Sequence, residues 1–138
     1  MHLFTLVSSI GICGLLLSAC SQPDEITSRH YAGLVVGHAA RLKVEIARSL
    51  TASPGKPVPQ AGVLRLEPPP GLTPVQFDFG WITSSGAIIV QSNEYSVVLV
   101  QEPVQTAEGV KWNCVVHPAA AKPILCGSEY ENSTLKAK

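Results

Sequence analysis

Residues 109–126, GVKWNCVVHPAAAKPILC, decide the fold of this 138-residue chain. Every second residue at the start of this stretch falls on one face of an extended chain, namely Val110, Trp112, Cys114 and Val116. A period of two is typical of a half-buried strand. The alternation ends at His117, and the two prolines that follow lack the N–H group that a strand ladder requires. The stretch therefore predicts a last strand that leaves the sheet as a loop and returns to Cys126.

Two cysteines stand at the ends of this loop. A bond between Cys114 and Cys126 would close about a dozen residues and stabilise the fold by roughly 3 kcal/mol in the chain-entropy model. The alternative is a pair of unrelated buried thiols. The chain has four cysteines in all, and the other two, Cys13 and Cys20, lie in an apolar N-terminal stretch. This usage is typical of an exported protein, so we expect the disulfide and an oxidising compartment.

Residues 1–20 form an apolar segment, with no charged side chain before Asp24. The segment ends Leu17-Ser18-Ala19-Cys20, which resembles a bacterial lipobox. A short apolar run followed by small residues is typical of a secretory signal. The resemblance implies that Cys20 becomes the acylated first residue of the mature chain, delivered to the outer membrane. We therefore expect a cell-envelope protein that is attached to the membrane by a lipid anchor.

Residues 21–53 carry the signals of an amphipathic helix, with Ser21 as a candidate N-cap and Pro23 in the first turn. Apolar residues recur at spacings of three and four: Tyr31, Val35, Ala39, Leu42, Ile46 and Leu50. Charged residues are expected mostly off this stripe: Arg41, Lys43, Glu45 and Arg48. Arg41 and Glu45 are spaced to form an ion pair. We expect the stripe to pack on a sheet, the alternative being a groove binder.

Residues 54–74 form a connection that contains seven prolines. Pro54 disfavours helical backbone at the residue before it, so the helix is expected to end near Ser53. Residues 63–66, VLRL, predict one short edge strand between two polyproline-like pieces. The alternative is a polyproline ligand, but no basic residue flanks the prolines in the usual way. We therefore expect a variable connection between the helix and the sheet.

Residues 75–127 predict an antiparallel meander of about four strands, with the helix covering one face. The first strand, over 75–83, places Phe77, Phe79 and Trp81 on one face, and a turn at Gly86 leads into its partner over 87–90. A third strand begins at Tyr95 and is expected to end at Pro103. The strand that contains Trp112 completes the sheet.

The last strand and its loop resemble those of a known family. The pattern G-V-x-W-x-C followed by P-x-x-C is similar to the disulfide-bonded loop of type IV pilins, and its residues are Gly109, Val110, Trp112, Cys114, Pro123 and Cys126. The stretches WITSSGAIIV (81–90) and VVLVQEP (97–103) look like the pilin hairpin and the strand before its cysteine loop. Residues 29–47 resemble the exposed half of the pilin helix.

The same family offers another interpretation of the N-terminus. Phe4-Thr5-Leu6-Val7 resembles the start of the hydrophobic helix of a mature pilin. Leu3 stands where the family has the glycine that ends its leader, and Ser8 stands in place of a glutamate used in subunit docking. A membrane helix within residues 1–20 is thus the alternative to the lipobox.

Composition and motifs argue against several function classes. Ten basic residues balance ten acidic ones, so we expect no nucleic-acid partner. His30 and His38 fall about 80° apart around a helix rather than stacked, so we expect no metal site. No phosphate-binding loop, nucleophile elbow or paired-carboxylate spacing occurs, so we expect neither a cofactor nor enzymatic activity. Residues 128–138 form a polar tail.

The pilin resemblance implies an α+β fold, in which one long N-terminal helix packs on a four-stranded antiparallel sheet closed by the disulfide loop. It implies a structural or accessory subunit of a type IV pilus or related secretion filament, with other pilin subunits or pilus-machinery proteins as partners. Trp112 is expected to be a buried anchor beside the disulfide. Loops on a rigid scaffold often carry contacts, and the contact residues expected here are His117, Pro118, Lys122 and Pro123.

Two alternatives remain. The first is a lipid-anchored pilin-like protein that caps, binds or regulates the pilus machine. The second is an outer-membrane lipoprotein that serves as a binding module unrelated to pili.

Overall fold

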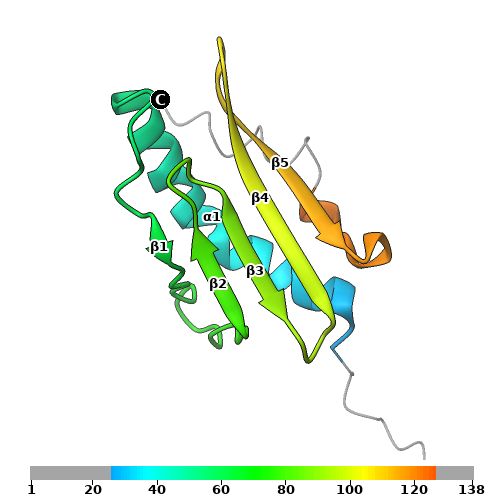
Figure 1. Ribbon diagram of the computed structural model, residues 1–138. Helices are drawn as coiled ribbons and strands as arrows, with labels where there is room; N and C mark the ends of the chain where they lie inside the picture. Colours follow the sequence, from blue (N-terminus) through cyan, green and yellow to red (C-terminus); the bar gives the residue numbers. More distant parts are fainter. Residues whose placement is uncertain (1–25, 127–138) are drawn as a thin grey trace, which may run out of the picture.

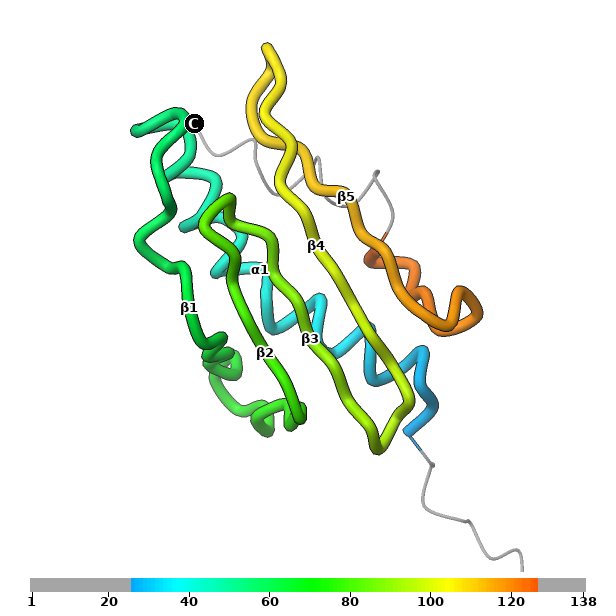
Figure 2. The backbone as a smooth tube through the Cα atoms, in the orientation of Figure 1, coloured from blue at the N-terminus to red at the C-terminus, as the bar shows by residue number. Residues whose placement is uncertain are grey.

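One helix packs on one face of an antiparallel sheet in the computed structural model of the chain (Figure 1). The structure describes residues 26–126. The helix lies behind the sheet in Figures 1 and 2, and no other helix or strand of the described residues covers the face toward the viewer. The α+β prediction is therefore confirmed, as two layers enclosing one apolar core.

The helix α1 spans Ser28–Ala52. Thr27 is its N-cap, because its backbone is extended and its hydroxyl accepts a hydrogen bond from the His30 N–H at 3.1 Å. The helix thus begins later than the predicted start at Ser21, which lies outside the described residues. Its C-cap is Ser53, where the sequence places the end of the helix.

The predicted stripe of α1 faces the sheet. Leu42 is half-buried, and the other stripe residues are buried: Tyr31, Val35, Ala39, Ile46 and Leu50. The buried surface is wider than the stripe, because Lys43 is only 8% exposed, against the prediction that it lies off this surface. The predicted Arg41–Glu45 pair is confirmed at the surface, with 3.3 Å between Nε and Oε1.

Five strands form the sheet, one more than predicted: β1 (Gly62–Val63), β2 (Phe79–Ile82), β3 (Ile88–Ser92), β4 (Val97–Thr106) and β5 (Gly109–His117). They lie side by side in chain order, and each pairs antiparallel with the next. The additional strand, β1, lies in the proline-rich connection near the predicted edge strand. It joins the sheet through the pairs Gly62↔Ile82 and Val63↔Trp81.

Strand β4 continues through Pro103, where the sequence predicts its end. The pairing of β3 with β4 stops at Gln101, whereas the pairing of β4 with β5 continues to Thr106↔Gly109. Beyond Gln101 one edge of β4 is therefore free of β3. Proline is tolerated in a strand where its nitrogen faces such an edge, because no ladder hydrogen bond is lost there.

Strand β2 is shorter than predicted, and its aromatic residues do not all share one face. Phe79 and Trp81 point away from α1 and are 48% and 41% exposed, whereas Phe77 precedes the strand and packs against the core. Gly80 makes room for this ring, since a Cβ at Gly80 would lie 2.9 Å from Leu64 Cβ and closer still to the Phe77 ring.

Hydrogen bonds attach the end of the proline-rich connection, and the residues just after it, to α1. The Tyr31 hydroxyl donates to the Gln76 carbonyl at 2.6 Å. The two ring nitrogens of the buried His38 lie 2.8 Å from the Leu34 carbonyl oxygen and 3.1 Å from the Thr73 carbonyl oxygen. The connection is therefore docked on the helix over this part of its length.

None of the helices within residues 26–126 has the length and apolar character needed to cross a bilayer. The predicted signal or membrane segment 1–20, the lipidation site Cys20 and the polar tail 128–138 lie outside the described residues.

Candidate interaction surfaces

The chain after β5 folds back toward α1 as a closed loop. A cis peptide bond joins His117 to Pro118, and two short 3-10 helices follow, η1 (Ala119–Ala121) and η2 (Ile124–Cys126). The loop ends at a disulfide between Cys114 and Cys126, whose Cα atoms are 5.3 Å apart. The predicted disulfide is confirmed.

Contacts with the first turns of α1 attach this loop to the body of the domain. The Arg29 Nε donates to the Lys122 carbonyl at 3.0 Å. A Cβ built on Gly33 would lie 3.6 Å from the Pro123 Cβ, so the proline packs directly on the helix. Pro123 is buried. It is therefore a packing residue, which corrects its predicted place in an exposed contact surface.

The outward side of the loop is a mixed polar and apolar surface. His117, Pro118 and Lys122 are exposed, as a contact surface requires. Ile124 and Leu125 are 74% and 42% exposed. Both lie within the loop over residues 115–125 that the sequence predicts as a recognition surface, although neither is among the four contact residues named from the sequence. We call these five exposed residues the loop surface.

Trp112 lies between the sheet and α1, two positions from Cys114 on the same face of β5. It is 4% exposed, which agrees with a buried anchor. The Lys43 Nζ lies 5.0 Å from the centre of its ring, within the range of a cation–π interaction. This contact explains why α1 turns a lysine toward the core.

The anchor Trp112 and the neighbouring Gln101 have buried polar atoms without a hydrogen-bond partner within residues 26–126. Both side-chain polar atoms of Gln101 and the Nε1 of Trp112 lack a hydrogen-bond partner among the described residues. Gln101 is fully buried and stands opposite Cys114 in the sheet. An unsatisfied buried polar group costs about 1–3 kcal/mol. We therefore expect Gln101 to lower the stability of the core.

The sheet face away from α1 carries a continuous apolar row. Strand register sets one residue of every strand side by side: Val63, Trp81, Ile89, Val100 and Val115. Directly opposed residues on one face have Cβ atoms about 4.5–5.5 Å apart, so these side chains touch in sequence across the sheet. The two ends of the row are the most open, with Val63 69% and Val115 64% exposed. We call these five residues the outer row.

A second row runs beside the outer row and adds to its apolar character. It contains Phe79, Gln91, Val98 and His117. Phe79 is 48% and Val98 38% exposed. The charged Glu102 and Lys111 lie farther along β4 and β5, opposite Asn113 and Val104. The two rows together therefore present a mostly apolar face, whose polar members are Gln91 and His117.

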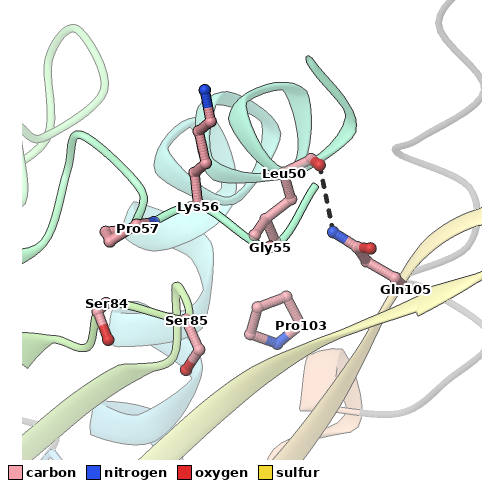
Figure 3. A pocket seen from close by; sticks show the side chains of 8 residues that line it. All are labelled: Leu50, Gly55, Lys56, Pro57, Ser84, Ser85, Pro103 and Gln105. Carbon is pink, nitrogen blue, oxygen red and sulfur yellow. Dashed lines mark hydrogen bonds between the residues drawn. The ribbon is translucent and has the colours of Figure 1, made fainter. Parts of the chain in front are cut away.

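A hollow of about 390 Å³ lies at the C-terminal end of α1 (Figure 3). Its lining comes from the helix end, the β2–β3 loop and β4: Leu50, Gly55, Lys56, Pro57, Ser84, Ser85, Pro103 and Gln105. The Gln105 Nε2 donates to the Leu50 carbonyl at 3.2 Å and closes one side. The lining contains neither a histidine nor a carboxylate, and no hydrogen bond joins Lys56 to Ser84 or Ser85 among the described residues.

The titratable groups of the described residues form no metal cluster. No set of three or more His, Cys, Asp or Glu side chains within residues 26–126 is placed to hold a metal ion. Burial raises the pKa of the Tyr31 phenol, whose ring stacks on Tyr95 with 4.4 Å between ring centres. This stacked pair joins α1 to the β3–β4 turn and has a structural role.

Comparison of the chain with models of known protein families gives no match. Searches among curated proteins and among solved structures also give no match. Inference about function therefore depends on the residues and surfaces described above.

Proposed function

We propose that this chain is a pilin-like, non-catalytic protein of the bacterial cell envelope, acting as a structural or accessory subunit of a type IV pilus or related secretion filament. One observation carries the proposal. The Cys114–Cys126 bond closes a loop at the end of the last strand of a meander that packs on an N-terminal helix. The last strand and this loop together carry the residues of the pilin-like pattern G-V-x-W-x-C and P-x-x-C.

Of the two roles, we propose the lipid-anchored accessory. The sequence Leu17-Ser18-Ala19-Cys20 supports acylation at Cys20, and Ser8 stands in place of the docking glutamate of filament subunits. If Cys20 is acylated, seven residues separate the membrane from the N-cap Thr27, and they can span at most about 25 Å. The domain would then be held close to the surface of the membrane that carries the anchor.

The loop surface is the proposed contact with pilin subunits or pilus-machinery proteins. Ile124 and Leu125 supply exposed apolar area, and Lys122 supplies a charge beside it. The disulfide and the Arg29–Lys122 hydrogen bond limit the motion of the loop. A loop that is ordered before binding loses less conformational entropy when its partner docks.

A second candidate function is an outer-membrane lipoprotein that serves as a binding module unrelated to pili. The outer row favours this candidate, because exposed apolar surface across five strands is typical of a protein-binding face.

Extraction in mild detergent from the cell that makes the protein tests the pilus role. The full chain carries a C-terminal tag, and co-purified proteins are quantified by mass spectrometry. The variant Ile124→Ser with Leu125→Ser is compared with Val104→Ser, a matched control on the end of β4. We expect pilin or pilus-machinery proteins with the wild type and the control, and their loss with the loop variant. Enrichment of other envelope proteins alone would support the binding module instead.

A further inference from the structure

The outer row fits a second copy of this chain. We propose that two copies dock face to face through their outer rows, related by a twofold axis that lies midway between the two sheets and parallel to β3. This inference concerns a different surface from the loop surface and does not depend on the pilus role.

The exposed apolar area is large enough to supply most of the apolar contact of a dimer. Five residues on this face have large exposed fractions: Val63 69%, Phe79 48%, Trp81 41%, Val98 38% and Val115 64%. With about 200 Å² for an aromatic side chain and about 100 Å² for a valine, these fractions give roughly 350 Å² of exposed apolar area for each copy. Two copies would bury about 700 Å², most of the apolar share of a standard interface of about 1,600 Å².

Large and small side chains are distributed unequally over the face. The aromatic residues Phe79 and Trp81 both lie on β2, on one side of the central strand β3. Valines occupy the other side, on β4 and β5. A face with this distribution is complementary to itself, because rotation by 180° about an axis parallel to β3 brings the aromatic strand β2 of one copy over the valines of β4 in the other.

The register of the strands identifies the opposing residues. Rotation about this axis sets β2 of one copy over β4 of the second copy. Trp81 then lies over Val100 of the second copy, and Phe79 lies over Val98. The same rotation sets β1 over β5 and brings Val63 onto Val115 of the second copy. Aligned sheets pack face to face at about 10 Å, a distance that interdigitated side chains of these sizes fill.

The charged groups nearest to the two rows do not meet their own equivalents across the interface. Glu102 borders the outer row, two positions after Val100 on β4, and Lys111 lies farther out, opposite Val104. The twofold axis carries the two Glu102 side chains to opposite sides of β3, so that they do not meet. Gln91, in the middle of the second row, lies on β3 itself and faces its own equivalent, where two amides can exchange hydrogen bonds.

The oligomeric state of the full chain in detergent tests the proposal. We expect a concentration-dependent dimer by sedimentation equilibrium. Val115→Glu should weaken dimerisation at least about a hundredfold, because symmetry buries the new carboxylate twice. Val104→Glu, on the same face but outside both rows, is the matched control and should leave the dimer unchanged. Val115 is 64% exposed in the single copy, so the substitution leaves folding intact, which thermal unfolding checks.

A photo-crosslink locates the interface. A benzophenone amino acid at Phe79, in a mixture of chains with light and heavy isotopes, should crosslink to the Val98–Val100 segment of the other isotope. A monomer at all concentrations, or a dimer that Val115→Glu leaves unchanged, would overturn the proposal. So would crosslinks from Phe79 only to residues of its own chain or, in envelope extracts, only to a different protein. Failure of the pilus pull-down would leave all of these readouts unaffected, so the two proposals fail separately.

Discussion

Removal of the loop disulfide should destabilise the domain by about 3 kcal/mol. The Cys114–Cys126 bond has a sequence separation of 12 residues. In the chain-entropy model, a closed loop of this length lowers the entropy of the unfolded chain by an amount worth about 3 kcal/mol at 25 °C. Cys114→Ala with Cys126→Ala is the suitable variant. Both positions are buried, at 8% and 2% exposure, and alanine introduces no unsatisfied hydroxyl.

The loss should also be local before it is global. The Arg29–Lys122 hydrogen bond and the packing of Pro123 on α1 remain in the variant, so the sheet is expected to stay folded. Amide exchange should accelerate first in the two 3-10 helices η1 and η2 and in the first turns of α1, which they contact. Urea unfolding followed by tryptophan fluorescence gives the free energy, and exchange mass spectrometry gives the location.

Reduction of the wild type supplies the matched control. Reductant should lower the stability of the wild type to about that of the double variant and leave the variant unchanged. A difference below about 1 kcal/mol, or faster exchange in β2 and β3 with the loop unaffected, would refute the reasoning. Either result would mean that the loop does not depend on its cross-link.

Four further substitutions test the packing of the core and its response to pH. Gly80→Ala should destabilise the domain by about 1–3 kcal/mol in urea unfolding, because the added methyl would overlap the Phe77 ring. Gly37→Ala, on the exposed side of α1, is the control and should stabilise by about 0.5–1 kcal/mol. Equal effects of the two substitutions would contradict the close contact. Gln101→Met should stabilise by about 1 kcal/mol by removing unpaired polar atoms, and a loss of stability would show that these atoms have partners. Because burial raises the pKa of Tyr31, its contribution to stability should be complete below about pH 10 and decline above it, where the unfolded chain loses the phenolic proton first. Tyr31→Phe should flatten this decline in stability–pH profiles, and an unchanged slope would contradict it.

The elements with the strongest periodicity were predictable from the sequence. The alternation around Trp112 predicted a strand whose buried side is the one observed, and the spacing of two cysteines predicted the bond that closes the loop. The stripe of α1 predicted the face that meets the sheet. In each case the pattern lies within one element, and burial follows from the local period alone.

The remaining features depend on pairing between distant segments. Pro103 is tolerated within β4 because the pairing with β3 reaches only to Gln101, opposite Ile88. The sequence around Pro103 does not show how far the neighbouring strand extends. Pro123 looks like a loop residue and is buried because Gly33, ninety residues earlier in the chain, faces it. The outer row exists only through the register of five strands, so no single stretch of sequence displays it.

The most direct test of the proposed envelope protein is the intact mass of the membrane-extracted chain, measured before and after reduction. We predict a chain that begins at acylated Cys20 and gains about two mass units when the Cys114–Cys126 bond is reduced. A chain that begins at Phe4 with a methylated amine would make the protein a filament subunit instead of an anchored accessory. An unprocessed chain without acylation, with no mass change on reduction, would contradict both the anchor and the cysteine loop on which the proposed function depends.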